Sequence, residues 1–249
     1  ASDARFSVLL GAELARRAAD VADVAAVTEP LAEACLFTDV RDGFDLARLA
    51  KKHKIRQRMR RLREQYDDAR VVVHTADTIE PGLDRLVTLH DARWAELGHP
   101  LQGLLARPGH RAFLLDAVRA LDAEGMVNLL TLEAGGRPAA VELDFRLGRR
   151  VFLFKGTFHP DFAAFSPSQL LTNRVFEDGL ADGIEVFDFC RGDVLYKRRW
   201  TNGERHLSTV TLTQTGLAGS LARRRLRLAR AAERRVQVRR ASAGPSQTS

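Results

Sequence analysis

Residues 150–200 contain the feature that most constrains the fold: a strand, a loop, a helix and a second strand in close succession. Val151–Thr157 is a short run of apolar and aromatic residues, which is typical of a buried strand. Ser166-Pro167 predicts a helix start, because the N–H that proline lacks would be unpaired in the first turn anyway. The helix is expected to end at Gly183, and Ile184–Phe189 reads as the second strand. Such a β-α-β unit predicts that both strands lie in one sheet.

The start of this helix is a candidate anion site. Its first turn offers unpaired N–H groups and the positive end of the helix dipole, which together suit a phosphate. Ligands of open α/β sheets also gather at the carboxyl ends of the strands. A purely structural role is the alternative, since such units are common without a ligand. The polar groups expected near this point are Lys155, Ser166, Ser168, Gln169, Asp188, Cys190, Arg191, Tyr196 and Lys197.

Three strands are predicted just before this unit. Residues 126–133, 138–147 and 150–157 alternate around turns at Gly135-Gly136 and at Gly148, so they form an antiparallel meander. Glu142 and Asp144 share one face of the middle strand. If that face lines a cleft, one of them is a candidate general base; if it faces solvent, both are surface carboxylates.

Further elements follow from periodicity. Residues 45–66, 83–97 and 111–123 have helical spacing, and residues 71–75 and 206–213 have the character of strands, the last one at a sheet edge. The expected architecture is therefore of the α+β or α/β class: a mixed, mostly antiparallel central sheet flanked by helices.

Charge divides the chain unevenly. Residues 46–63 hold nine Lys or Arg and no acid, residues 223–240 hold nine Arg and one acid, and the remainder holds 21 basic and 31 acidic residues. This division argues against a uniformly basic nucleic-acid-binding domain. Residues 45–66 are interpreted either as a solvated amphipathic helix on the body or as a contact for an anionic surface or nucleic acid.

Length and composition set the organisation. The chain has 249 residues, 45% of them hydrophobic and 29% charged, which is ordinary for a globular protein. No apolar run is long enough to span a bilayer and no signal peptide is recognised, so a cytoplasmic location is expected. The two cysteines, Cys35 and Cys190, make neither a disulfide framework nor a metal site. We predict an N-terminal remnant of an upstream part (1–44), weakly packed over residues 1–27, a main domain (45–215) and an Arg-rich C-terminal helix with a disordered tail (216–249).

Four motifs in the same order resemble the BcsL/CelD-like branch of the GNAT (N-acetyltransferase) superfamily, which is related to FemAB-type aminoacyltransferases. They are an H-D-x-R-W helix at His90–Trp94, a helix start at Ser166–Ser168, a G-x-x-x-FDF strand at Gly183–Phe189 and a G-D-x-x-YK-x-x-W segment at Gly192–Trp200. The likeness extends from about Leu46 to Thr213. It implies a GNAT-like fold and transfer of an acyl group, most simply acetyl from acetyl-CoA, to an amine connected with polysaccharide or envelope synthesis.

The resemblance also suggests roles for particular residues. Tyr196 is expected to protonate the leaving thiolate, while Asp188 and Glu142 are candidate bases. The acyl-acceptor groove is expected to include His90, Arg93 and Trp94, although Arg93 and Trp94 also suit structural roles. No metal is expected. The predicted donor-binding residues are Lys155, Gly156, Ser166, Ser168, Gln169, Leu170 and Lys197, with the backbone edge at 154–157 holding the pantetheine arm.

The sequence departs from the superfamily pattern at one point. The usual Gly-containing phosphate loop is missing, and Ser168 stands where the branch often has Gly. Two alternatives therefore stay open: a GNAT-like module that binds a polyanion without catalysis, and a transferase of the FemAB type that uses aminoacyl-tRNA. A dedicated nucleic-acid-binding function is not expected. Hydrolase, NTPase and zinc-enzyme motifs do not occur in the sequence.

Overall fold

The computed structural model describes residues 24–41, 43–98 and 109–214, together with 216, 219–221, 224–225 and 228. For residues 24–33 and 208–214 it describes the backbone alone. Ala34–Arg205 forms one compact unit, and a second unit comprises the chain before Ala34 and from His206 onwards. The features analysed below belong to the unit Ala34–Arg205.

The centre of the fold is a seven-stranded sheet with the order β2-β3-β4-β5-β6-β1-β7. The pairs β2–β3, β3–β4, β4–β5 and β1–β6 are antiparallel, whereas β5 and β6 are parallel. This mixed sheet with flanking helices confirms the expected fold class. The strands are β1 (Val24–Asp39), β2 (Arg70–Val73), β3 (Val127–Ala134), β4 (Arg137–Leu147), β5 (Arg150–Phe158), β6 (Val186–Arg191) and β7 (Gly203–Gln214).

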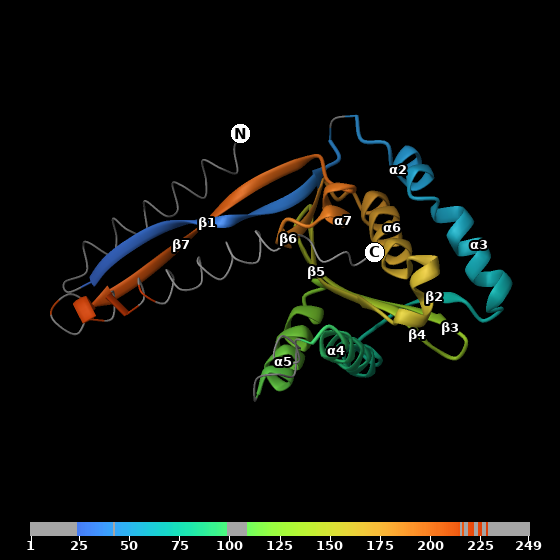
Figure 1. Cartoon of the computed structure of the whole chain (residues 1–249), viewed down its shortest axis with the longest axis horizontal. Coiled ribbons are helices and arrows are strands. Elements are labelled where there is room, and N and C mark those ends of the chain that lie inside the picture. The colour runs from blue at the N-terminus through green and yellow to red at the C-terminus, as the bar shows by residue number, and fades with distance from the viewer. Residues whose placement is uncertain are drawn as a thin grey trace. The chain divides into compact units, whose positions relative to one another are not determined.

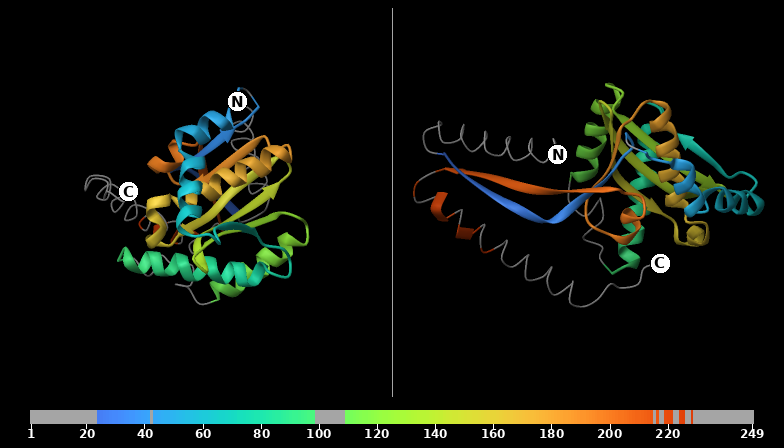
Figure 2. Two further views of the ribbon diagram at one scale, coloured as in Figure 1. Left: turned by 90° about the vertical axis from the view of Figure 1, so that its right-hand side faces the viewer. Right: turned by 90° about the horizontal axis from the view of Figure 1, so that it is seen from above.

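Helices cover both faces of the sheet (Figures 1 and 2). One face carries α2 (Leu46–Lys52), α3 (Ile55–Gln65) and α6 (Pro167–Ala181). The other carries α4 (Ile79–Glu96) and α5 (His110–Asp122). Two short helical turns, η2 (Pro160–Phe165) and α7 (Leu195–Arg198), precede α6 and follow β6.

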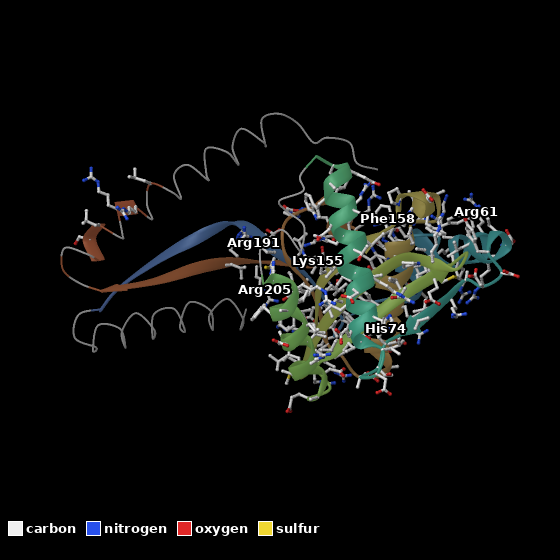
Figure 3. The ribbon with its side chains drawn as sticks, turned by 90° about the horizontal axis from the view of Figure 1, so that it is seen from below. Arg61, His74, Lys155, Phe158, Arg191 and Arg205 are labelled. Carbon is white, nitrogen blue, oxygen red and sulfur yellow. The ribbon has the colours of Figure 1, made fainter. Side chains whose placement is uncertain are left out.

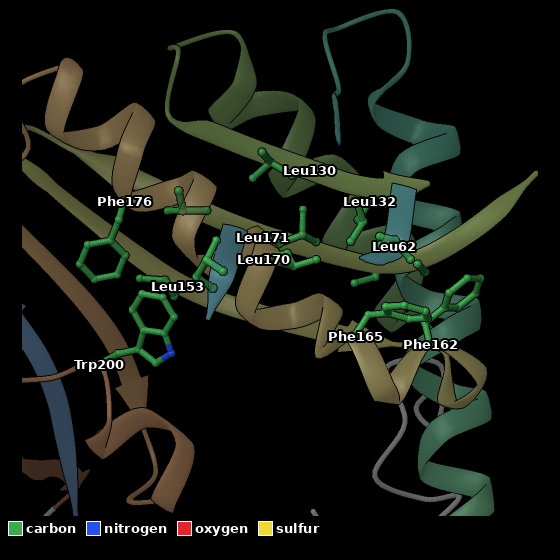
Figure 4. Close-up of a cluster of buried hydrophobic side chains, with 14 of the residues drawn as sticks. Leu62, Leu130, Leu132, Leu153, Phe162, Phe165, Leu170, Leu171, Phe176 and Trp200 are labelled. Atoms are coloured by element: carbon green, nitrogen blue, oxygen red, sulfur yellow. The ribbon is translucent and has the colours of Figure 1, made fainter. Parts of the chain in front are cut away.

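Each face of the sheet has its own hydrophobic core, because successive strand residues point to opposite faces. Leu130 and Leu132 of β3 pack with α3 and α6, together with Phe176 and Trp200 (Figure 4). Leu129, which directly precedes Leu130 in β3, points to the opposite face and packs in the core under α4 and α5. The polar residues of the same strands are therefore also divided between two faces.

The meander and the β-α-β unit agree with the sequence-based prediction. The three strands predicted at 126–133, 138–147 and 150–157 are β3, β4 and β5, and the strand predicted at the sheet edge is β7. The helix predicted between the two parallel strands is α6.

One local expectation is wrong. Residues 45–66 form two helices rather than one, because Lys54 adopts a left-handed conformation with φ of 53°. The predicted helix start is confirmed, since Ser166 is the N-cap residue and Pro167 begins α6, although Ser166 is left-handed and its side chain caps no N–H group. The weak packing expected for residues 1–27 concerns side chains outside the described part of the chain.

Some expectations lie outside the described residues. They are the structure of residues 1–23, most of the helix expected at 216–240 and the tail at 241–249. The domain boundary at residue 45 stays a prediction.

Candidate active site

The candidate site begins where β5 and β6 part. Their parallel pairing covers Arg150–Val186, Val151–Phe187 and Phe152–Asp188, and it ends there although β5 continues to Phe158. The register of β5 against β4 also shifts between Leu143 and Asp144, as a β-bulge produces. From residue 153 onwards the β6 side of β5 therefore has no described strand partner. This agrees with the free backbone edge expected at 154–157.

Glu142 and Asp144 lie on the face of β4 that α6 covers, and both are buried, at 6% and 0% exposure. The Thr172 hydroxyl of α6 donates to Glu142 Oε2 at 3.4 Å, and Asn128 Nδ2 donates to Asp144 Oδ2 at 3.4 Å. No basic side chain of the described chain pairs with either carboxyl. Burial therefore raises the pKa of Glu142 to about 8, and burial followed by the charge of Glu142 raises the pKa of Asp144 well above its ordinary value.

Tyr196 lies on the short helix α7, and about half of the whole residue is exposed. The protein packed around its phenolic oxygen nevertheless desolvates that oxygen and raises its pKa to about 12, with further contributions from the charges of Glu142 and Cys190. The phenol is therefore close enough to Glu142 for the charge of that carboxylate to raise its pKa, and it stays protonated throughout the neutral pH range. Two predicted catalytic residues, from β4 and α7, are thus brought into one neighbourhood.

The loop that carries Tyr196 is fastened to β6 by Lys197. Its ammonium donates to the carbonyl oxygens of Phe189 at 2.7 Å and Arg191 at 2.9 Å. Arg198 pairs with Asp193 at 2.5 Å in the same loop. The Lys197 ammonium thus holds the loop in place through two backbone carbonyls, and its contact with a donor phosphate stays a prediction.

Asp188 is buried at 3% exposure and its charge is balanced. Oδ2 forms ion pairs with Arg150 at 3.5 Å and with Arg205, which is labelled in Figure 3. Oδ1 accepts a hydrogen bond from the N–H of Cys190 at 2.8 Å, and this bond holds Cys190 in the left-handed region with φ of 55°. In this setting Asp188 organises the end of β6, whereas Glu142 is the predicted base that no cation neutralises.

Cys190 is a thiol here. Burial, and next the charge of Asp188, raises its pKa to about 12. A thiol of this kind is a poor nucleophile at neutral pH.

Lys155 and the α4 residues meet on the opposite face of the sheet. Lys155 is partly buried, and burial lowers the pKa of its ammonium (Figure 3). The pKa of His90 is lowered first by burial and then by the charge of Lys155, so the two side chains are neighbours. Trp94 Nε1 donates to His90 Nε2 at 2.9 Å, which satisfies the indole. Arg93 forms a 3.4 Å ion pair with Glu96 and lies 5.4 Å from the ring centroid of Phe158.

The start of α6 combines free and engaged groups. The N–H of Ser168 donates to no acceptor in the described chain, whereas the N–H of Gln169 donates to the carbonyl of Ser166 at 2.9 Å. Ser166 and Ser168 are partly exposed, and Leu170 is buried. Of the backbone N–H groups expected to hold a phosphate, that of Gln169 is therefore engaged within the turn, whereas that of Ser168 is available.

Basic and aromatic groups from distant segments surround this helix start. Gln169 Oε1 accepts from Arg58 at 2.7 Å and interacts with His53 Nδ1 at 3.0 Å. The pKa of Arg58 is lowered by burial and by the charge of Arg199, so two guanidinium groups lie near one helix N-terminus. His53 stacks on Trp200 at 4.4 Å, which fixes this arrangement. Two like charges without a carboxylate partner among the described residues are suited to binding a phosphate.

Sequence reasoning did not single out His53, Arg58 or Arg199. His53 and Arg199 lie in segments whose contact depends on tertiary structure. One signal did exist for Arg58: it lies between Ile55 and Leu62 at helical spacing, which puts it near the inward face of α3.

This combination of a partly antiparallel sheet, diverging parallel strands and a helix N-terminus beside the divergence defines an acyltransferase-type fold of the GNAT class. Residues 50–198 match the acetyltransferase (GNAT) domain family, and the chain belongs to that family. Members of this class use acetyl-CoA as co-substrate. A comparison with curated proteins finds no significant match.

Solved structures support the fold at low sequence identity. The C-terminal domain of a protein assigned as a lysylphosphatidylglycerol synthetase, from Agrobacterium fabrum, is 15% identical with a TM-score of 0.51, over 84% of this chain and 67% of that one. FemX is 11% identical with a TM-score of 0.51, over 71% and 61%. A conserved protein of unknown function from Bacteroides thetaiotaomicron is 15% identical with a TM-score of 0.50, over 76% and 62%. The chain thus spans about three-fifths of the length of FemX and of the Bacteroides protein.

The described residues contain no helix that is long and apolar enough to cross a membrane. The same residues contain no group of three or more His, Cys, Asp or Glu side chains that could hold a metal ion.

Proposed function

We propose that the chain is an N-acyltransferase that moves an acyl group, most simply acetyl, from CoA to an amine. One observation carries this proposal: Glu142, a buried carboxyl that no described cation neutralises, contributes to the raised pKa of the Tyr196 phenol beside the divergence of β5 and β6. A carboxylate of raised basicity and a protonated acid close to each other are the two groups that acyl transfer to an amine requires.

The donor would be held by three features of this chain. The N–H of Ser168 and the dipole of α6 favour a phosphate, and Arg58 and Arg199 add positive charge nearby. The backbone of residues 153–158, unpaired on the β6 side, offers hydrogen bonds to an extended pantetheine arm. Ser166, Gln169 and Leu170 shape the same helix turn, and the α-carbon of Gly156 lies on the free edge.

Acid and base roles follow from the pKa directions. Glu142, with its pKa raised to about 8, is a stronger base than an ordinary carboxylate and accepts the proton that the acceptor amine loses. Tyr196 remains protonated and donates its proton to the departing sulfur as the thioester bond breaks and the amide bond forms. Asp188 positions the end of β6 through its two arginine partners.

The body of the acceptor would lie on the α4 face of the sheet, and its amine would pass the free edge of β5 to reach Glu142 on the α6 face. His90, Arg93, Trp94 and Lys155 lie together there, and they present a mixed aromatic and basic surface. We propose membership of the CelD-like branch and an amine of the cytoplasmic steps of polysaccharide or envelope synthesis as the acceptor. The four sequence motifs support this assignment.

A second candidate function is favoured by the surface of α2 and α3. Eight of the twelve exposed residues between 46 and 65 are basic, and Arg58 of α3 reaches Gln169 at the start of α6. Such a surface suits a long polyanionic donor such as an aminoacyl-tRNA, or a polyanion that a non-catalytic module would bind. The exposed basic residues are Arg48, Lys51, Lys52, Lys54, Arg56, Arg60, Arg61 and Arg63.

Urea denaturation with and without acetyl-CoA tests the main proposal. At about 100 times the dissociation constant, acetyl-CoA should raise the unfolding free energy by about 2.7 kcal/mol. An unchanged midpoint at low and high salt contradicts CoA as the donor. Binding of tRNA that weakens steeply with salt, in the absence of any acetyl-CoA effect, favours the second candidate.

A further inference from the structure

Almost every glycine that the structure describes between residues 43 and 203 has a structural explanation. Most have a positive φ, which other residues rarely adopt. Three others are too crowded for a side chain: a Cβ would lie 2.8 Å from His74 at Gly82, 2.7 Å from Phe187 at Gly179 and 2.4 Å from Phe37 at Gly203. The glycines with a positive φ are Gly43, Gly98, Gly109, Gly125, Gly135, Gly136, Gly148, Gly183 and Gly192.

Gly156 has neither explanation. Its φ lies outside the left-handed region, and it is exposed within the strand β5. A Cβ at this position would meet Glu142 Cγ and Cδ at 3.7 Å and Oε1 at 3.9 Å, which is ordinary van der Waals contact. Alanine would therefore fit, and it normally stabilises a strand relative to glycine. The missing side chain is not required by the fold.

The group beside this gap is the carboxyl of Glu142. Gly156 and Glu142 are direct partners in the β4–β5 register, so a side chain at 156 would point to the same face as Glu142. Oε2 accepts from Thr172, whereas Oε1, the oxygen nearer to Gly156, accepts no hydrogen bond from the described residues. Asp144 Oδ1 is unpaired and fully enclosed by protein, whereas Glu142 Oε1 is not fully enclosed.

The position of Gly156 along β5 also matters. It lies beyond Phe152, where pairing with β6 has ended, so no neighbouring strand covers that side of the residue. The three atoms nearest to a Cβ at residue 156 all belong to the Glu142 side chain. A Cβ there would therefore shield this carboxyl.

We propose that Gly156 is a specificity-determining residue: its bare α-carbon is the opening through which the nitrogen of the acceptor amine reaches Glu142. This inference rests on the proposed acyltransferase function and adds the route of the acceptor to it. A methyl group at 156 narrows the route, and an isopropyl group closes it. The donor contacts at Ser168 and Arg58 lie on other elements, and the backbone N–H and carbonyl groups of residue 156 that would face the pantetheine arm are kept in both variants.

The test compares the wild type with Gly156→Ala, Gly156→Val and Gly179→Ala. A water-soluble carbodiimide and methylamine, a small mimic of the acceptor, are used to label carboxyls, and labelling of Glu142 is measured by peptide mass spectrometry. We expect Glu142 to be labelled in the wild type and about tenfold less in Gly156→Val. Gly156→Ala should raise the melting temperature by about 1–4 °C. Gly179→Ala, which crowds Phe187, should lower it.

Several outcomes would overturn the proposal. They are an unlabelled Glu142 in the wild type, equal labelling in Gly156→Val, or a Gly156→Ala variant destabilised like Gly179→Ala. Acetyl-CoA binding separates this inference from the proposed function. If acetyl-CoA stabilises the wild type and both Gly156 variants equally while labelling is unchanged, the opening is refuted and the function stands. If labelling depends on residue 156 but acetyl-CoA has no effect, the opening stands and the function is refuted.

Discussion

Replacing Glu142 with glutamine should make the protein more stable at neutral pH and less active. Glu142 is almost fully buried, with one hydrogen bond from Thr172 and no cation beside it in the described chain. Charging such a group costs far more in the folded protein than in the unfolded chain, where water solvates it. Glutamine keeps the shape and can still accept from Thr172, but it never ionises.

The size of the effect follows from the pKa. Burial raises the pKa of Glu142 from its ordinary 4.5 to about 8. The protonated carboxyl therefore stabilises the fold fully below pH 4.5, and this contribution is lost as the pH rises through 8. Between the ordinary pKa and the raised one, each pH unit lowers the free energy of unfolding by about 1.4 kcal/mol, because Glu142 ionises only in the unfolded chain. At pH 7 this loss amounts to roughly 3 kcal/mol. Glu142→Gln should recover this amount at pH 7 and gain nothing below pH 4.5.

Urea unfolding at pH 5, 7 and 8.5, followed by the fluorescence of the two tryptophans, measures the difference between variant and wild type. Glu133→Gln is the matched control, because Glu133 pairs with Arg70 and Arg85, each at 2.7 Å. It should lower stability at pH 7 by about 1 kcal/mol. A Glu142→Gln variant that is less stable than the wild type at pH 7, or whose advantage is the same at pH 5 and 8.5, refutes the reasoning.

Two further predictions concern the donor and the acid. Tyr196→Phe should lower turnover about 100-fold while acetyl-CoA still stabilises the variant as it does the wild type; a loss of that stabilisation in urea denaturation contradicts an acid role. Arg58→Ala should raise the dissociation constant for acetyl-CoA about tenfold by calorimetry, because a charged partner at the start of α6 is removed. Arg56→Ala, an exposed neighbour on the same helix, is its control and should change the constant less than twofold, so equal effects would refute a specific role for Arg58.

The meander and the β-α-β unit were predictable because their signals are local. Alternation of apolar and polar residues, the Gly135-Gly136 turn and the Ser166-Pro167 helix start each depend on residues only a few positions apart. The same holds for the shared face of Glu142 and Asp144, which follows from the two-residue period of a strand.

Two features were missed because they depend on distant partners. The strand β1 is paired with β6 from Cys35↔Arg191 to Asp39↔Val186, and nothing near Cys35 in the sequence indicates that partner. The break between α2 and α3 is likewise secured from afar. His53 stacks on Trp200 and interacts with Gln169, so the left-handed Lys54 that follows it is held in place by residues more than 100 positions away.

The sequence by itself determined the order of the strands and helices in the central part, the mixed character of the sheet and the family to which the chain belongs. Tertiary structure alone decided which carboxyls have raised pKa values. A strand with Glu142 and Asp144 on one face has the same pattern whether water or a helix covers that face, and here α6 covers it. Burial under that helix, without a neighbouring cation, raises the pKa of both side chains and turns two ordinary acidic residues into a candidate catalytic base and its buried neighbour.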